Sequence, residues 1–148
     1  MLFLPLADRG WALPAVPRDR RHLIAWASLA TVGIGLLLWQ PAHLGFALAT
    51  LLLAALPEEW FFRAYFMTRL GAGWRANLLA SLLFAVMHGF SRGWTTAVLV
   101  FIPSLFYGWL YQRTRDLPLL ILVHGLSNLL YVLFVAHLLA MMHLLDLR

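Results

Sequence analysis

Long apolar runs occupy most of this sequence, and they limit the folds that the chain can adopt. The runs are residues 22–39, 44–70, 76–90, 94–112 and 117 to about 145. A helix needs about 20 apolar residues to cross a membrane, so 148 residues leave room for about five crossings and no separate soluble domain. We therefore predict an all-α fold, a polytopic transmembrane helix bundle of about five spans that forms one integral membrane domain.

The composition excludes a soluble globular protein and argues against a nucleic-acid-binding one. Hydrophobic residues make up 63% of the chain and charged residues only 11%, against roughly a quarter charged in soluble domains. The net charge of +5 comes from arginine without any lysine. Most of these arginines lie in the leader and in short connectors, where basic residues set membrane topology. We expect the lipid bilayer, and no nucleic acid, as a partner.

Residues 1–21 form a basic leader that we expect at the membrane interface, ahead of a helix bundle at residues 22–145. Most arginines fall on one side of the predicted bundle, namely Arg9, Arg18, Arg20, Arg21, Arg69, Arg75, Arg113 and Arg115. Because basic residues are retained on the cytoplasmic side, the N-terminus is predicted inside and the C-terminus outside. The use of arginine alone points to a GC-rich bacterial genome and hence to the bacterial inner membrane.

Two prolines and one acid predict local features of the helices. Pro57 and Pro103 lie inside apolar runs, and proline removes a backbone hydrogen bond, so we expect the second and fourth helices to kink or break there. Asp116 stands before Leu117-Pro118, a pattern typical of an N-cap and a first helical turn. It predicts the start of the last helix.

Charged residues inside the second run are the most informative feature of the sequence. Glu58, Glu59 and Arg63 stand in an apolar helix, where each charge costs on the order of 2.5–3.5 kcal/mol and usually has a partner. Glu59 and Arg63 are four residues apart and share a helix face, which predicts an ion pair. Glu58 points about 100° away and stays free to act. The alternative is a buried ion pair that only orders the helices.

Two further polar groups lie at a similar depth. His88 ends the motif Phe84-Ala85-Val86-Met87-His88 in the third run, and His124 and Asn128 share one face of the fifth. At about 1.5 Å per residue, these three residues and the charged three all lie about 10 to 18 Å from the inner ends of their helices. One shared site is therefore possible. The remaining histidines are interpreted as interfacial or packing residues: His22, His43, His137 and His143.

These residue types suit the hydrolysis of an amide bond. A carboxylate beside an imidazole can activate water as a general base, and a second imidazole with an amide can donate hydrogen bonds to an oxyanion. The chain has no cysteine, which excludes a cysteine nucleophile. The hypothesis is a peptidase inside the membrane that needs no metal or cofactor and acts on a membrane-associated polypeptide. The oligomeric state is left open.

The three motifs together resemble those of the glutamic intramembrane endopeptidases. These include the type II CAAX prenyl proteases, their bacteriocin-processing relatives and small bacterial members of protein-sorting systems. The resemblance rests on Glu-Glu-x-x-x-Arg, Phe-x-x-x-His and His-x-x-x-Asn in this order, over about half the chain. It implies that Glu58 and His88 activate water and that Glu59 and Arg63 order the site. His124 and Asn128 would stabilise the oxyanion. The small size favours a bacterial processing or sorting protease.

Other interpretations of these residues remain. A zinc-dependent hydrolase would use His88, His124 and a glutamate as ligands, although the His-Glu-x-x-His helix is missing. A haem-binding electron carrier would use the same histidines as axial ligands. A scaffold or immunity protein would keep the polar residues for packing alone. Residues 89–93 match the Gly-x-Ser-x-Gly pattern of serine hydrolases, but that turn belongs to an α/β sheet.

Overall fold

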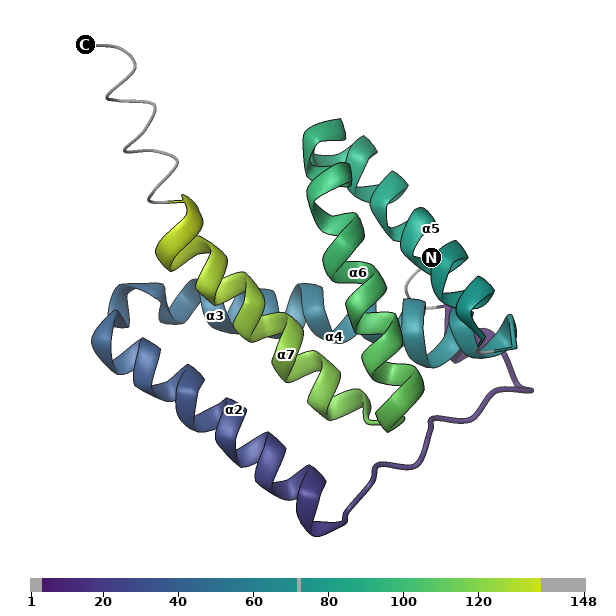
Figure 1. Cartoon of the computed structure of the whole chain (residues 1–148), viewed down its shortest axis with the longest axis horizontal. Helices are drawn as coiled ribbons and strands as arrows, with labels where there is room; N and C mark the ends of the chain where they lie inside the picture. The colour runs from purple at the N-terminus through teal and green to yellow at the C-terminus, as the bar shows by residue number, and fades with distance from the viewer. Residues whose placement is uncertain (1–3, 72, 137–148) are drawn as a thin grey trace.

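A computed structural model describes residues 4–71 and 73–136, and every regular element among them is helical (Figure 1). The α-helices are α1 (Leu4–Ala7), α2 (Arg20–Trp39), α3 (Leu44–Thr50), α4 (Leu56–Glu59), α5 (Trp74–Arg92), α6 (Trp94–Thr114) and α7 (Leu117–Leu130). Shorter helical pieces join or extend them: the 3₁₀ turn η1 (Pro41–His43) and the π-helices η2 (Leu51–Ala55), η3 (Trp60–Met67) and η4 (Tyr131–Ala136).

The predicted all-α, polytopic fold is confirmed. Four described helices are long and apolar enough to cross a membrane: Arg20–Trp39, Pro41–Met67, Trp94–Thr114 and Leu117–Ala136. Helix α5 takes the place of the third predicted span but is not among these four. The last predicted span is described as far as Ala136. Its remainder, with His137 and His143, lies outside the described residues.

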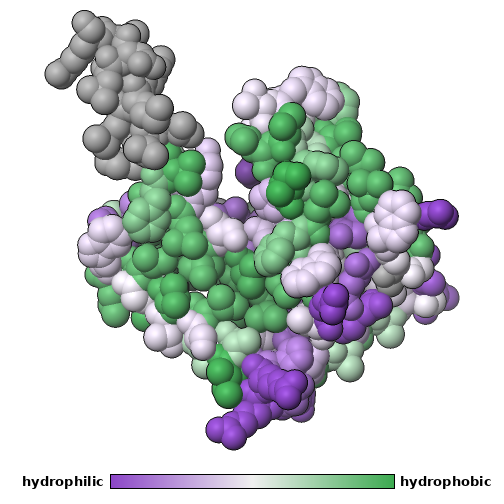
Figure 2. Space-filling model, viewed as in Figure 1, coloured by the Kyte–Doolittle hydropathy of each residue, from purple (hydrophilic) through white to green (hydrophobic). Residues whose placement is uncertain are grey.

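The outer surface of the described chain suits a lipid environment. Leu38, Leu53 and Val98 are 78%, 77% and 73% exposed, and no residue of α2 is buried. Figure 2 shows apolar residues over much of one face, with hydrophilic residues gathered near the start of α2 at the bottom and along the right-hand side. Exposed apolar surface of this extent is typical of a membrane or protein contact.

Both helices in which a kink or break was expected continue through their internal proline, so no break occurs. Pro103 lies inside α6, which is α-helical from Trp94 to Thr114. Pro57 lies in α4, between the π-helices η2 and η3 of one continuous helix that runs from Pro41 to Met67. Proline removes one backbone donor and crowds the preceding turn, and the wider π-turns on either side accommodate it. Such π-segments are frequent at functional sites.

A tight contact joins α5 and α6, which lie side by side in Figure 1. Gly108 of α6 faces Asn77 of α5 so closely that an added Cβ would collide with the amide. Nδ2 of Asn77 donates to the carbonyl oxygen of Leu105, 3.0 Å away. The core next to this contact combines both helices with η3 and α7 through Ala64, Met67, Ala76, Ala80, Tyr107, Tyr111 and Leu120. These contacts hold α6 next to the continuous helix Pro41–Met67, which carries Glu58, Glu59 and Arg63.

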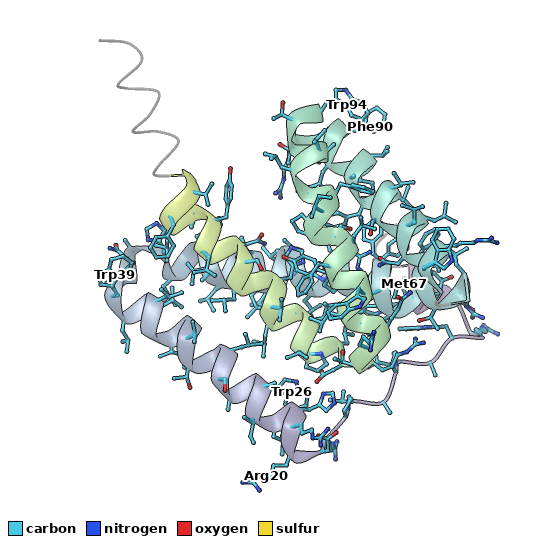
Figure 3. All side chains as sticks on the ribbon, in the orientation of Figure 1. Arg20, Trp26, Trp39, Met67, Phe90 and Trp94 are labelled. Atoms are coloured by element: carbon cyan, nitrogen blue, oxygen red, sulfur yellow. The ribbon has the colours of Figure 1, made fainter. Side chains whose placement is uncertain are left out.

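The start of α7 is anchored by the fully buried Asp116. Its carboxylate accepts a hydrogen bond from the Leu119 N–H at 2.9 Å, which confirms the predicted N-cap. The same carboxylate bonds Nδ1 of His22 and, at 2.8 Å, the indole N–H of Trp26. Both side chains belong to α2, and Figure 3 shows Trp26 beside the beginning of α7. Asp116 therefore ties α2 to the helix that carries His124.

The leader packs against the end of the long helix. Asp8 forms an ion pair with Arg69 at 2.6 Å. The indole of Trp11 donates to the Ala64 carbonyl at 3.3 Å and stacks on Trp60, with ring centroids 6.3 Å apart. These contacts fasten residues 8–11 to η3 and its vicinity.

Candidate active site

A buried ion pair connects the two halves of the first motif. Nε of Arg63 lies 3.3 Å from Oε2 of Glu59, and both side chains are buried (0% and 1% exposed). This confirms the ion pair predicted from their spacing. Because Glu59 ends α4 and Arg63 lies in η3, the wide π-turn still leaves the two side chains within reach of each other.

Arg63 also makes two bonds to α6. Its Nη2 donates to Oγ of Ser104 at 2.6 Å and to the carbonyl oxygen of Ser104 at 3.1 Å. Ser104 is completely buried. The guanidinium carbon lies 5.7 Å from the centroid of the Phe84 ring. Arg63 is therefore fixed from three sides, which is how a cation is retained away from water.

His124 lies between the two glutamates. Its Nδ1 lies 2.8 Å from Oε1 of Glu59, and its Nε2 lies 3.9 Å from Oε2 of Glu58. A carboxylate paired with Arg63 can only accept a hydrogen bond, so Nδ1 of His124 carries a proton and donates it. The second nitrogen is left facing Glu58.

Tyr107 of α6 supports the ring of His124 from one side. The two rings are stacked, with centroids 4.9 Å apart and an interplanar angle of 26°. Tyr107 is itself buried, so α6 holds this face of the His124 ring from inside the bundle.

His88 and Glu58 share a cavity of about 340 Å³. Its lining is Glu58, Met87, His88, Phe90, Ser91 and Arg92. Nδ1 of His88 lies 3.0 Å from the Phe84 carbonyl oxygen. A carbonyl can only accept, so Nδ1 carries the proton and Nε2 of the neutral ring is an acceptor. Glu58, with its side chain 16% exposed, and His88 thus present two acceptors to one cavity.

Five of the six predicted site residues lie together in the structure, and the sixth, Asn128, is not connected to them by a contact. Direct contacts join Glu58, Glu59, Arg63 and His124, and the cavity adds His88. Asn128 lies one turn after His124 on α7, half-buried, and its side chain makes no hydrogen bond to any other described residue. The motif places Asn128 near the site, while the contacts do not connect it.

Two residues of α6 at the site, Ser104 and Tyr107, were not predicted from the sequence. A signal for them was present, because Ser104, Tyr107 and Tyr111 repeat at intervals of three and four residues in an apolar helix. That spacing puts them on one face. All three are buried, so this polar stripe faces the bundle interior.

Two alternative sites lack the geometry that they need. Ser91 lies in the last turn of α5 and donates to the Met87 carbonyl at 2.9 Å, so the Gly-x-Ser-x-Gly match is not a turn between strand and helix. Among residues 4–71 and 73–136, no three histidine, aspartate or glutamate side chains form a group suited to a metal ion. The ligand set of the zinc hypothesis is not assembled there.

Comparison with protein families decides the assignment. The model of the family described as type II CAAX prenyl endopeptidase Rce1-like matches residues 39–130, which is more than half of the chain and includes all three motifs. The chain belongs to this family. It is accordingly an integral membrane protein of a protease family whose substrates are polypeptides in a membrane. No curated protein and no solved structure matches the chain significantly.

Proposed function

We propose that this CAAX-family member is a glutamic endopeptidase in which Glu58 and His88 activate the hydrolytic water. One observation carries the proposal: two adjacent glutamates occupy opposite environments. Glu59 is sealed between Arg63 and His124, whereas Glu58 lines a cavity with His88. A structural ion pair needs only Glu59, so Glu58 is the carboxylate available for chemistry.

The first step follows from the two acceptors in the cavity. A water molecule between the Glu58 carboxylate and Nε2 of His88 donates one hydrogen bond to each, which directs an oxygen lone pair toward a substrate carbonyl. As the new carbon–oxygen bond forms, the water proton moves to Glu58. The carbonyl π-electrons move onto oxygen and give a tetrahedral oxyanion.

The second step needs a donor for the oxyanion and a proton for the leaving amine. We assign the donors to Asn128 and to the ring of His124, which lies between two carboxylates. The protonated Glu58 returns its proton to the amine nitrogen as the carbon–nitrogen bond breaks. Water is then the only group consumed, and Glu58 is again a carboxylate.

The cellular context proposed here rests on the sequence. We propose one membrane domain over residues 1–148, located in a bacterial inner membrane with the N-terminus inside. The substrate is a membrane-associated precursor that is processed or sorted. Neither metal nor cofactor has a role in the two steps above.

The decisive experiment replaces Glu58 by glutamine and compares the membrane and secreted proteomes with those of the wild type. The matched control is Asp19→Asn, since Asp19 caps α2 with a 61% exposed side chain and asparagine is an equally good cap. We expect a precursor to accumulate only with Glu58→Gln, while circular dichroism shows a folded variant. Unchanged processing of every membrane protein would refute the proposal.

A further inference from the structure

The cavity beside Glu58 contains one charged residue that the mechanism does not use. Arg92 lies in the last turn of α5, one turn after His88, and lines the same cavity as Glu58 and His88. Its side chain makes no hydrogen bond and no ion pair within 4.0 Å to any other described residue. Arg63, in contrast, is buried and held by three groups, whereas Arg92 is exposed. Arg92 is thus a cation without a fixed partner at the catalytic cavity.

Apart from Glu58 and His88, the cavity offers that cation no partner. Met87 and Phe90 are apolar, and the Ser91 hydroxyl is committed to the Met87 carbonyl. Phe90 and Trp94 pack together with ring centroids 5.4 Å apart, and Figure 3 shows them at the end of the α5–α6 pair far from Arg20. Besides His88, the cavity therefore combines apolar walls with one carboxylate and one guanidinium. A guanidinium favours a planar anion that it can bind through two hydrogen bonds.

From this arrangement we propose that Arg92 is a substrate-binding residue that holds a carboxylate of the peptide close to the bond attacked at Glu58. The proposal rests on the proposed function and adds a specificity to it. Arg92 and Glu58 line one cavity of about 340 Å³. A group bound at Arg92 and the bond attacked at Glu58 therefore belong to the same short stretch of substrate.

A peptide carboxylate has two sources, the chain end and an acidic side chain, and both offer the same chemistry to Arg92. A lipid phosphate is the competing occupant. We favour the peptide because Glu58 lines the same small cavity, and a reacting peptide must enter it for the base to act.

The test measures binding, so it does not depend on turnover. Glu58→Gln protein in phosphatidylcholine nanodiscs is titrated with a fluorescent apolar tetrapeptide that ends in a free carboxylate. The same tetrapeptide as a carboxamide, and that carboxamide with one internal glutamate, form the other two arms. A charged hydrogen bond contributes about 1.5–3 kcal/mol, so at least one carboxylate peptide should bind about tenfold or more tightly than the plain carboxamide.

Arg92→Gln should abolish that preference and Arg92→Lys should keep part of it. The matched control is Arg75→Gln, which removes an arginine from the first turn of the same helix and should leave the preference unchanged. The free-acid and internal-glutamate arms identify which carboxylate Arg92 holds.

The proposal is overturned if neither carboxylate peptide is preferred, if none binds, or if the preference survives Arg92→Gln. It is also overturned if Arg92 governs affinity for phosphatidylglycerol nanodiscs and not for peptides. An Arg92-dependent preference together with normal precursor processing by Glu58→Gln would count against the catalytic proposal alone.

Discussion

Nδ1 of His124 lies 2.8 Å from Oε1 of Glu59, although the two residues are 65 positions apart in the chain. This contact joins α7 to α4, and the Arg63–Ser104 bond joins the same long helix to α6. The polar residues of three helices thus form one connected network inside an apolar bundle. Glu58 stands at its margin, where the network meets the cavity.

The two glutamates should respond differently to the same substitution. Glu59→Gln removes the charge that compensates the buried Arg63, and breaking a buried pair costs about 3–5 kcal/mol. Glu58→Gln should cost much less, because the Glu58 side chain is partly exposed and has no close ion pair. Unfolding of both variants in the same detergent measures the difference. Equal destabilisation would contradict the division of roles between the glutamates.

Tyr107 should affect the rate through its ring. Tyr107→Leu removes the stacking on His124, which is worth about 0.5–1.5 kcal/mol, so kcat on the precursor found with Glu58→Gln should fall about 2- to 10-fold. Tyr107→Phe keeps the ring and should retain most of the activity. If the phenylalanine variant is as impaired as the leucine variant, the stacking on His124 does not explain the role of Tyr107.

Gly108 should tolerate no side chain. In Gly108→Ala the new methyl group meets the Asn77 amide, so α5 and α6 must separate or the Asn77–Leu105 bond must break. We expect a loss of about 1–3 kcal/mol in unfolding free energy, as for other overpacked sites. Gly45→Ala is the matched control, since nothing lies within 4 Å of its added Cβ. A Gly108→Ala protein as stable as Gly45→Ala would show that the helices are less closely packed.

The leader should detach from the bundle in acid. Partial burial alone would raise the pKa of Asp8, but hydrogen bonds from Gly10, Tyr65 and Arg69 and the Arg69 charge lower this pKa below its ordinary value of 3.8. A lowered folded-state pKa means that the contact stabilises the leader above 3.8 and is lost as the pH falls below it.

A spin label at Ala12→Cys reports this release, because the chain has no other cysteine. The label should be restrained at neutral pH and become mobile as the pH falls below 3.8, while the helix content by circular dichroism is retained. When Asp8→Asn is introduced into the Ala12→Cys protein, the spin label should be mobile at every pH. Label mobility that does not change with pH would show that Trp11, and not Asp8, holds the leader.

Residues close in sequence allowed the local features to be predicted. Four-residue spacing predicted the Glu59–Arg63 pair because one helix turn brings such side chains together. Asp116 before Leu117-Pro118 predicted the N-cap of α7, because an N-cap side chain bonds a backbone N–H only three residues away. Neither helix breaks at Pro57 or Pro103, so that part of the expected kink or break was wrong: neighbouring turns and helices compensate for the missing donor in ways that local sequence does not show.

The sequence by itself determined that the chain is an apolar helix bundle with charged residues at membrane depth, because hydrophobic runs and helical periodicity are local properties. Only the tertiary structure decided that His124 lies between the two glutamates, that Ser104 and Tyr107 support the site, and that Arg92 reaches the Glu58 cavity. Those relationships depend on how the helices are rotated and packed against one another, and contacts between residues distant in the chain set that packing.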